Sequence, residues 1–176
     1  MTTREEFESF DQHAIIKVVG VGGGGGNAVN RMIEAGLSDV QFIVINTDAQ
    51  DLKKSLAPIR LQIGKGALGA GAKPEVGRQA CEEDRDRVRE LLAGGDLVFL
   101  ALGLGGGTGT GAAPIVAQEA SDTGALTIAI VTLPFSFEGD ERMSNALKGL
   151  DELEKYVDTL IVVPNDRIAE LSNANT

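Results

Sequence analysis

Short, nearly continuous apolar runs alternate with longer amphipathic stretches along this chain. The runs are rich in β-branched residues and predict strands at residues 15–21, 40–45, 59–63, 97–102, 126–133 and 160–163. The stretches place apolar residues at helical spacing and predict helices at residues 27–35, 49–55, 74–92, 112–120 and 141–156. Strands that are apolar on both faces and alternate with helices are typical of a parallel sheet covered on both sides. We therefore predict an α/β fold with a three-layer, Rossmann-like architecture.

Two predicted helices contain residues whose structural role can be inferred from their position. Pro114 falls in the first turn of the helix at 112–120, where the missing amide removes no helical hydrogen bond. In the last helix, one apolar stripe is interpreted as core packing and consists of Met143, Leu147, Leu150 and Leu153.

The helix at 74–92 is predicted to be continuous and to present a charged face to solvent. Two pairs of opposite charge stand at helical spacing in it, Glu83 with Arg87 and Asp86 with Arg89. Cys81 lies in the same helix and is predicted to be buried and inert. Because it is the only cysteine, the sequence excludes an intrachain disulfide.

Length and charge narrow the class of protein. The chain has 176 residues, which predicts one domain, at residues 14–176, preceded by a flexible arm at 1–13. A formal net charge of −10 argues against general binding to nucleic acid or to an anionic membrane, since phosphates would be repelled. No apolar run reaches the ~18 residues of a membrane span, and residues 1–12 contain no apolar signal segment. We expect a cytoplasmic protein without membrane insertion.

Two glycine-rich stretches follow predicted strands, Gly22–Gly26 after the first and Leu104–Gly111 after the fourth. Glycines let backbone amides converge without Cβ clashes, and a helix that begins there adds partial positive charge. Two hydroxyls, those of Thr108 and Thr110, can add hydrogen bonds to phosphate oxygens. Each stretch is expected to be a loop that binds phosphate, with the first ending at Asn27.

The carboxyl ends of parallel strands meet at one edge of the sheet, where ligands bind. The loops expected there are residues 22–27, 46–48, 64–73, 103–111, 134–142 and 164–166. Two glycine-rich loops suit the phosphate chain of a nucleoside di- or triphosphate. A single one would suit a dinucleotide-binding oxidoreductase domain, which stays as an alternative. The GxxxxGK[ST] pattern is absent, so the phosphate charge would fall to backbone amides and Mg²⁺.

Several residues at this edge allow two interpretations. Asp48 fits both a helix N-cap and a ligand contact. The small-residue loop at 64–73 either covers a phosphate or connects two elements at the surface. Glu138 and Arg142, four residues apart, form either a surface ion pair or a clamp on ribose hydroxyls.

The segment GGGTGTG at residues 105–111 resembles the signature of the tubulin/FtsZ family. Further blocks resemble the family in the same order, at residues 16–29, 44–50, 134–139 and 164–166. The similarity covers about residues 14–176. It implies a GTPase domain that binds GTP or GDP, with Mg²⁺ accompanying GTP.

The resemblance also implies a role for each matching residue. The first phosphate loop would comprise Gly23, Gly24, Gly25, Gly26 and Asn27, with Asn27 also near the guanine. The second would wrap the α- and β-phosphates and comprise Gly106, Gly107, Thr108, Gly109 and Thr110. The loop over the γ-phosphate would comprise Ala70, Gly71 and Ala72, ending at Lys73.

Four side chains complete the site that the resemblance implies. Asn46 and Asp48 would lie by the phosphates, with Asp48 reaching the metal only through bound water and no residue binding it directly. Glu138 and Arg142 would hold the ribose, and Asn165 would recognise the guanine.

The chain departs from the family pattern in two places. The loop at 64–69 is shorter than usual and Lys73 replaces a common Asn, which affects the segment that senses the γ-phosphate. Family members also continue into a central helix and a second domain, whose acidic loop positions the attacking water in the neighbouring subunit's site. No catalytic residue is therefore assigned in this chain, which is expected to be nearly inactive alone.

The resemblance implies that the parent protein polymerises head to tail into the bacterial division ring at the septum. Its partners would be further copies of itself and division proteins. A nucleotide-dependent interaction module without hydrolysis is the remaining alternative.

Overall fold

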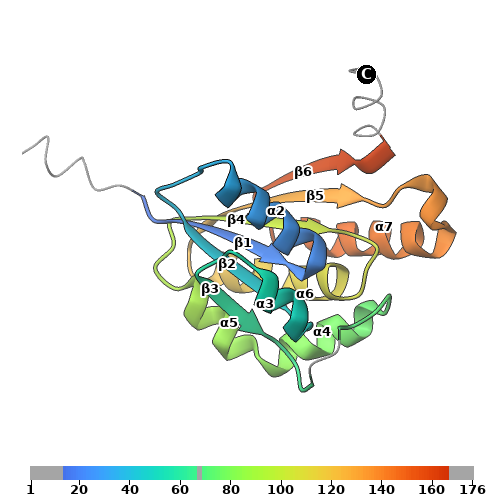
Figure 1. The fold of residues 1–176 in the computed structure, drawn as a ribbon, viewed down its shortest axis with the longest axis horizontal. Coiled ribbons are helices and arrows are strands. Elements are labelled where there is room, and N and C mark those ends of the chain that lie inside the picture. Colours follow the sequence, from blue (N-terminus) through green and yellow to red (C-terminus); the bar gives the residue numbers. More distant parts are fainter. Residues whose placement is uncertain (1–13, 67–68, 167–176) are drawn as a thin grey trace, which may run out of the picture.

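The computed structural model describes residues 14–66 and 69–166, so the predicted arm at 1–13 lies outside the described residues. The centre of the molecule is a parallel sheet of six strands in the order β3-β2-β1-β4-β5-β6. The strands are β1 (Ile16–Val21), β2 (Gln41–Asn46), β3 (Ile59–Gln62), β4 (Leu97–Gly103), β5 (Leu126–Leu133) and β6 (Thr159–Pro164). All five pairings are parallel, as predicted, and the arrowheads in Figure 1 point to one edge.

Helices cover both faces of the sheet and give three layers (Figure 1). One face is covered by α2 (Gly22–Glu34) and α3 (Ala49–Lys54). The other is covered by α4 (Pro74–Glu83), α5 (Arg85–Leu92), α6 (Thr108–Asp122) and α7 (Asp140–Glu154). A short 3-10 helix, η1 (Ser136–Glu138), precedes α7. The predicted α/β, Rossmann-like architecture is confirmed, and no described helix is long and apolar enough to cross a membrane.

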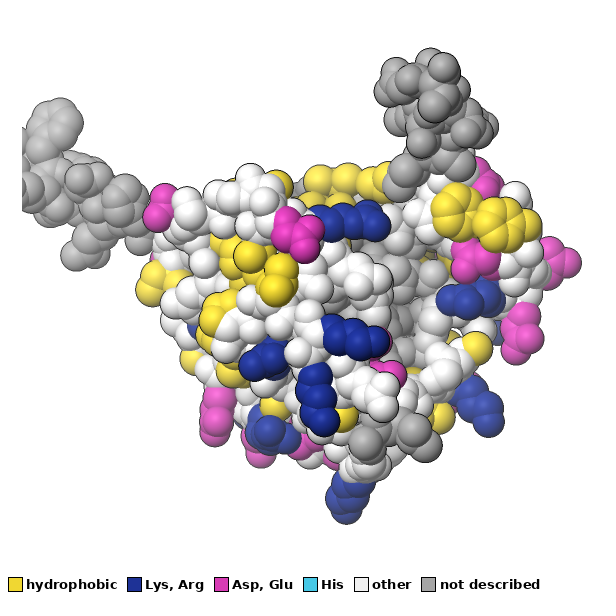
Figure 2. Space-filling model, viewed as in Figure 1, with side chains coloured by type: hydrophobic (Ala, Val, Ile, Leu, Met, Phe, Trp, Pro, Cys, Tyr) yellow, Lys and Arg dark blue, Asp and Glu magenta, His cyan; other side chains and the backbone are white. Residues whose placement is uncertain are grey.

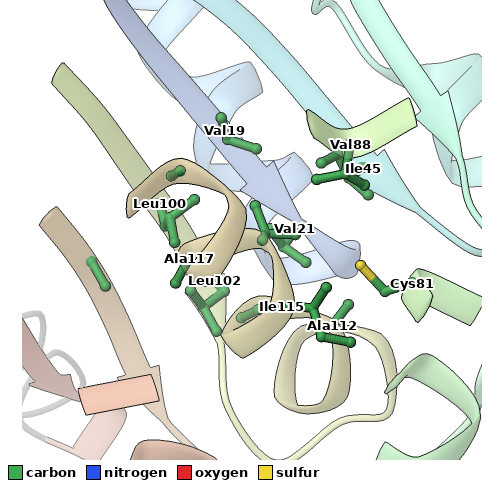
Figure 3. Packing of buried hydrophobic residues seen from close by; sticks show 14 of the residues in the cluster. Val19, Val21, Ile45, Cys81, Val88, Leu100, Leu102, Ala112, Ile115 and Ala117 are labelled. Atoms are coloured by element: carbon green, nitrogen blue, oxygen red, sulfur yellow. The ribbon is translucent and has the colours of Figure 1, made fainter. Parts of the chain in front are cut away.

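Successive residues of each central strand enter different cores. In β1, Val19 and Val21 join the larger core beneath α6, whereas Val18 joins the smaller core beneath α2. Figure 3 shows the larger core, in which β1, β2 and β4 meet α6 and the flanking α4 and α5. Both faces are therefore buried, which is why the central strands are apolar throughout.

The first glycine run is helical, and the prediction of a loop at Gly22–Gly26 is wrong. These residues form the first turns of α2, although glycine is a poor helix former. Packing overrides propensity here: a Cβ on Gly25 would collide with the Ala101 carbonyl oxygen of β4 and lie 2.9 Å from the Gly20 carbonyl carbon. Only a bare backbone lets the helix approach the two central strands this closely.

Two further helix boundaries differ from the prediction. The helix α6 begins at Thr108, so Pro114 lies in its interior rather than in its first turn. The predicted helix at 74–92 is divided at Asp84, whose backbone leaves the helical region (φ −113°, ψ 21°). The Asp84 carboxylate accepts a hydrogen bond from the Gly64 amide at 2.8 Å, and this contact ties the break to the end of β3.

The apolar stripe predicted for the last helix is only partly buried. Leu153 is buried as expected, but the side chain of Leu147 is 49% exposed. Ala146 and Gly149 are the other buried residues of α7. A Cβ on Gly149 would lie 2.6 Å from Thr110 Cγ2, so small residues rather than large ones make the contact with α6.

The face of α4 and α5 is less solvated than predicted. Arg87 contacts Asp84 at 3.4 Å instead of Glu83, although Arg89 does contact Asp86 at 3.4 Å. Arg85 and Arg89 also reach inward to Glu119 of α6. Cys81 is fully buried as predicted, and burial raises the pKa of its thiol to about 12.

Candidate functional site

The strand order reverses between β1 and β4, which are neighbours in the middle of the sheet. In open α/β sheets ligands bind beyond the carboxyl ends of the strands at such a switch point. Both glycine-rich stretches follow these two strands. A cavity of about 360 Å³ lies between them. Figure 2 shows the molecular surface hollowed beyond the strand ends, where it consists mainly of backbone and uncharged polar atoms.

Most of the predicted binding residues line this cavity. They are Gly23, Gly24, Asn46, Asp48, Ala70, Gly71, Gly106, Gly107, Thr108, Gly109, Glu138, Arg142 and Asn165. The predicted residues outside the lining are Gly25, Gly26, Asn27, Ala72 and Thr110. Asp51 and Thr132 line the cavity but lie outside every predicted loop, while Gly22, Gly69 and Pro134 belong to loops that were expected at this edge.

The first wall of the cavity is the N-terminus of α2. Gly22 begins the helix directly after β1 with a positive φ of 75°, and Gly23 and Gly24 are exposed. No side chain caps this end, and its first turn contains no acidic residue. The first amides of a helix have no partners within it, so they are free to bind an anion.

The second wall is the loop before α6, and the hydroxyl of Thr110 maintains its shape. Thr110 Oγ1 accepts a hydrogen bond from the Gly105 amide at 2.8 Å. Gly105 has a φ of 106°, and a Cβ there would lie 2.6 Å from Pro134 Cγ. Thr110 therefore stabilises the shape of the loop through this hydrogen bond and does not line the cavity.

The third wall, formed by residues 69–71, is fastened to the second by Thr47. Its hydroxyl lies 2.8 Å from the Thr108 hydroxyl and accepts a hydrogen bond from the Ala70 amide at 3.2 Å. The Gly107 amide donates to the Gly71 carbonyl at 2.9 Å. The loop thus covers the cavity and is no mere surface connection. Thr47 was missed because its role arises only where three separate segments meet.

Two carboxylates stand at the cavity beside these amides. Asp48 Oδ1 accepts hydrogen bonds from the amides of Gln50 at 2.8 Å and Asp51 at 3.3 Å, so Asp48 is the N-cap of α3. The N-cap interpretation is therefore confirmed, and because Asp48 also lines the cavity, its ligand contact stays a prediction. Asp51 accepts a 3.5 Å hydrogen bond from the Asn46 side-chain amide. These two carboxylates can bind a cation or hydrogen-bond donors, whereas the backbone amides of the first and second walls can bind an anion.

Glu138 and Arg142 form the predicted pair, and both face the cavity. Arg142 Nε lies 3.7 Å from Glu138 Oε1, while Glu138 Oε2 accepts a hydrogen bond from the Phe135 amide. Asn165 lines the same end of the cavity. The Ser136 amide donates to Asp166 at 3.2 Å, which joins the segment after β6 to the loop after β5.

A three-layer α/β domain with two uncapped, glycine-rich helix N-termini at its switch point belongs to the class of α/β domains whose backbone amides can bind an anion. A sequence profile described as "Tubulin/FtsZ family, GTPase domain" matches residues 15–173. The chain belongs to the tubulin/FtsZ family, as its resemblance predicted.

Solved structures agree with this assignment. An empty FtsZ dimer from M. jannaschii is 42% identical with a TM-score of 0.90, over 97% of this chain and 52% of that one. The GDP-bound CetZ1 monomer from Haloferax volcanii is 29% identical with a TM-score of 0.79, over 86% and 51%. A GTPγS-bound CetZ2 protofilament from the same organism is 26% identical with a TM-score of 0.78, over 86% and 49%. The chain thus spans about half the length of the structures it matches.

Proposed function

We propose that this chain binds GTP and GDP in the cavity at the switch point. The observation that carries the proposal is the convergence of two helix N-termini, those of α2 and α6, on one cavity rich in glycine amides. Such amides neutralise phosphate charge through their dipoles, so no lysine is required. Membership of the tubulin/FtsZ family supports guanine nucleotides as the ligands.

The proposed roles follow the walls of the cavity. The amides of Gly23 and Gly24 bind phosphate from one side, and residues 106–109 bind it from the other. Glu138 and Arg142 hold the ribose hydroxyls, and Asn165 recognises the guanine edge with help from Asn27. The lining by Asn165 and the pairing of Glu138 with Arg142 support these roles.

Gly25, Gly26, Ala72 and Thr110 also belong to the proposed site, although they lie outside the cavity lining. The proposed contribution of Gly25, Ala72 and Thr110 is to shape the phosphate-binding segments, whereas Gly26 contributes only its helical backbone, which alanine would also supply. The hydrogen bond from the Gly105 amide to Thr110 and the tight packing of Gly25 support it.

Mg²⁺ is the proposed companion of GTP. Asp48 and Asp51 place two carboxylates beside a phosphate site, where a cation would relieve their repulsion of the ligand. Within residues 14–66 and 69–166, no group of three or more His, Cys, Asp or Glu side chains is arranged to hold a metal. In this proposal the Mg²⁺ ion is bound mainly by phosphate and water, with Asp48 accepting from a bound water.

We further propose that the parent protein is a cytoplasmic GTPase that polymerises head to tail and acts with division proteins in the bacterial septal ring. The dimer and the protofilament among the similar structures support self-association. Acidic groups from a second domain of the next subunit would orient the attacking water. Residues 14–176 form the nucleotide-binding domain in this proposal, and alone they hydrolyse GTP negligibly.

Calorimetric titration of the purified chain tests the binding proposal. GTP and GDP are expected to bind at least about tenfold more tightly than ATP, because a base-edge contact rejects the wrong base. Asn165→Ala should reduce this preference, whereas Asn145→Ala on α7, outside the cavity, should not. Binding of NAD instead of guanine nucleotides would indicate the oxidoreductase alternative. Binding of no nucleotide would indicate an interaction module.

Phosphate release tests the proposal about hydrolysis. The chain alone, with GTP and Mg²⁺, is expected to release phosphate at the rate of the uncatalysed control. Steady turnover by the chain alone would show that its own residues complete the catalytic machinery.

A further inference from the structure

The most deeply buried acidic side chain of the described residues lies far from the cavity, in the second half of α6. Glu119 is 1% exposed. Its Oε1 accepts hydrogen bonds from Arg85 Nη1 at 3.0 Å and Arg89 Nη2 at 3.2 Å, and its Oε2 accepts from Arg89 Nε at 2.8 Å. Arg85 is in turn paired with Glu82 at 2.7 Å. The cluster fastens α5 to α6.

A buried ionised cluster of this kind fixes geometry more than it adds stability. The hydrogen bond from Arg89 lowers the pKa of Glu119 against the opposing effect of burial, so the carboxylate is charged. An apolar side chain of similar size is often as stabilising as a buried ion pair, but it does not require one orientation of its neighbour. The two guanidinium groups do require one, because their donors stand in fixed planar geometry.

Near the start of α6, close contacts at glycines hold the neighbouring helix α4 against it. A Cβ on Gly77 of α4 would lie 2.8 Å from Thr108 Cα, and one on Gly111 of α6 would lie 2.7 Å from Arg78 N. The backbones of α4 and α6 therefore touch near the start of both helices. Together with the Glu119 cluster, this contact holds α4 and α5 against α6 at two separated points.

Helices α4 and α5 are also attached to the chain on both sides of the third wall of the cavity. At one end, the Gly64 amide donates to Asp84, the residue between α4 and α5. At the other, α4 begins at Pro74, directly after residues 69–73. Gly71 in that segment accepts the hydrogen bond from Gly107 in the phosphate-binding loop. A shift of α4 and α5 along α6 would therefore move the third wall of the cavity relative to the second.

We propose that Glu119 is a positioning residue for the nucleotide site: through Arg85 and Arg89 it holds α4 and α5 in the place that sets the spacing between residues 69–73 and the loop before α6. This spacing decides how well the site accepts the terminal phosphate of a nucleoside triphosphate. Glu119 thereby favours a triphosphate over a diphosphate. The inference rests on the proposed guanine-nucleotide site.

The first experiment compares the affinities of the chain for GTP and GDP by titration. Glu119→Gln removes the charge but keeps the size of the side chain, and it should weaken GTP binding about tenfold while changing GDP binding less than about twofold. Arg89→Gln breaks the same contact from the other side and should act alike. Glu83→Gln is the matched control on α4, since the only side-chain hydrogen bond of Glu83 among the described residues comes from Gln79. Equal losses of GTP and GDP affinity in both cluster variants would overturn the proposal.

The second experiment needs no nucleotide and separates the inference from the proposed function. Amide hydrogen exchange of the free chain should become at least about tenfold faster at Ala70 and Gly107 in Glu119→Gln, while Ala129 of β5 keeps its rate. Glu83→Gln should leave all three rates unchanged. If exchange rises equally at Ala129, Glu119 acts only on overall stability. If exchange does not rise at Ala70 and Gly107, Glu119 does not hold the third wall in place, and either result overturns the inference. If the unmutated chain binds neither GTP nor GDP, the proposed function is wrong, whatever the exchange result.

Discussion

Gly22–Gly26 and Gly105–Gly107 follow neighbouring strands and lead into helices that line the same cavity, yet their backbones differ. The first run passes directly from β1 into α2, and after Gly22, whose φ is 75°, its backbone is helical. The second remains a loop, in which Gly105 takes a φ of 106° before α6 begins at Thr108. The same composition therefore gives a helix on one side of the cavity and an irregular turn on the other.

The two runs use glycine for different physical reasons. From Gly23 onward the backbone of α2 is ordinary and the missing Cβ makes room, since Gly25 lies against the backbone of β4. In the loop before α6, the backbone conformation of Gly105 is one that L side chains rarely adopt. Glycine content alone thus identifies where phosphate-binding amides lie, but not how they are held. Substitution by alanine separates the two reasons.

Gly25→Ala is expected to have the largest effect. Its Cβ would collide with the Ala101 carbonyl oxygen and approach Gly20, and neither backbone atom can move without displacing a central strand. We expect a loss of at least about 3 kcal/mol in the free energy of unfolding, measured by urea denaturation. If the free energy of unfolding of the variant lies within about 0.5 kcal/mol of that of the unmutated chain, α2 does not require this close contact.

Gly105→Ala should cost somewhat less stability but should also damage the site. It combines an unfavourable φ with a Cβ 2.6 Å from Pro134 Cγ, and we expect a loss of about 2 to 3 kcal/mol together with weaker nucleotide binding.

Gly124→Ala is the matched control for Gly105→Ala, because Gly124 has a φ of 86° with nothing near its missing Cβ. It should cost about 1 kcal/mol and leave nucleotide affinity unchanged. Equal effects of the two variants would mean that the contact with Pro134 is unimportant.

Thr110→Val tests the side chain that shapes the second run from behind. The substitution keeps the volume but leaves the Gly105 amide without the acceptor that now lies at 2.8 Å. An unsatisfied buried donor costs about 1 to 3 kcal/mol, so we expect a loss near the lower value and a modest fall in nucleotide affinity. Thr123→Val is the control, since that hydroxyl donates to Ala120 at the end of α6, away from the cavity. No change in either quantity for Thr110→Val would show that the loop keeps its shape without the hydroxyl.

The hydrophobic pattern predicted the fold well because strands that are buried on both faces consist almost entirely of apolar residues. The apolar runs gave the parallel strands, and the glycine runs gave the edge at which the cavity lies. The start of α2 was missed because local propensity opposes it and the compensating contact with Ala101 comes from a distant strand. Local pattern finds elements, and distant contacts decide their boundaries.

The candidate site was predictable where a residue type alone indicates its chemistry, as for Asp48 and the glycine amides. Thr47 was missed because its contacts join segments far apart in the sequence. Asp51 was missed because it lies within α3, beyond the strand end at which ligand contacts were expected. Glu119 was missed for a different reason: an acidic residue in an amphipathic helix is usually exposed, and only the fold brings two arginines to it. Side chains that hold a site in place carry weaker sequence signals than groups that contact the ligand.

Gly26→Ala should have the smallest effect and the opposite sign. Gly26 is helical, and its Cβ would meet Val44 Cγ1 at 3.6 Å, an ordinary van der Waals contact. Alanine is the better helix former by about 0.8 to 1 kcal/mol, so urea denaturation should show a gain of up to that amount. Because Gly26 lies outside the cavity lining, nucleotide affinity should stay within about twofold of the parent. A tenfold loss of affinity with unchanged stability would mean that the nucleotide contacts Gly26 itself, and the first run would then serve the ligand as well as the packing of α2.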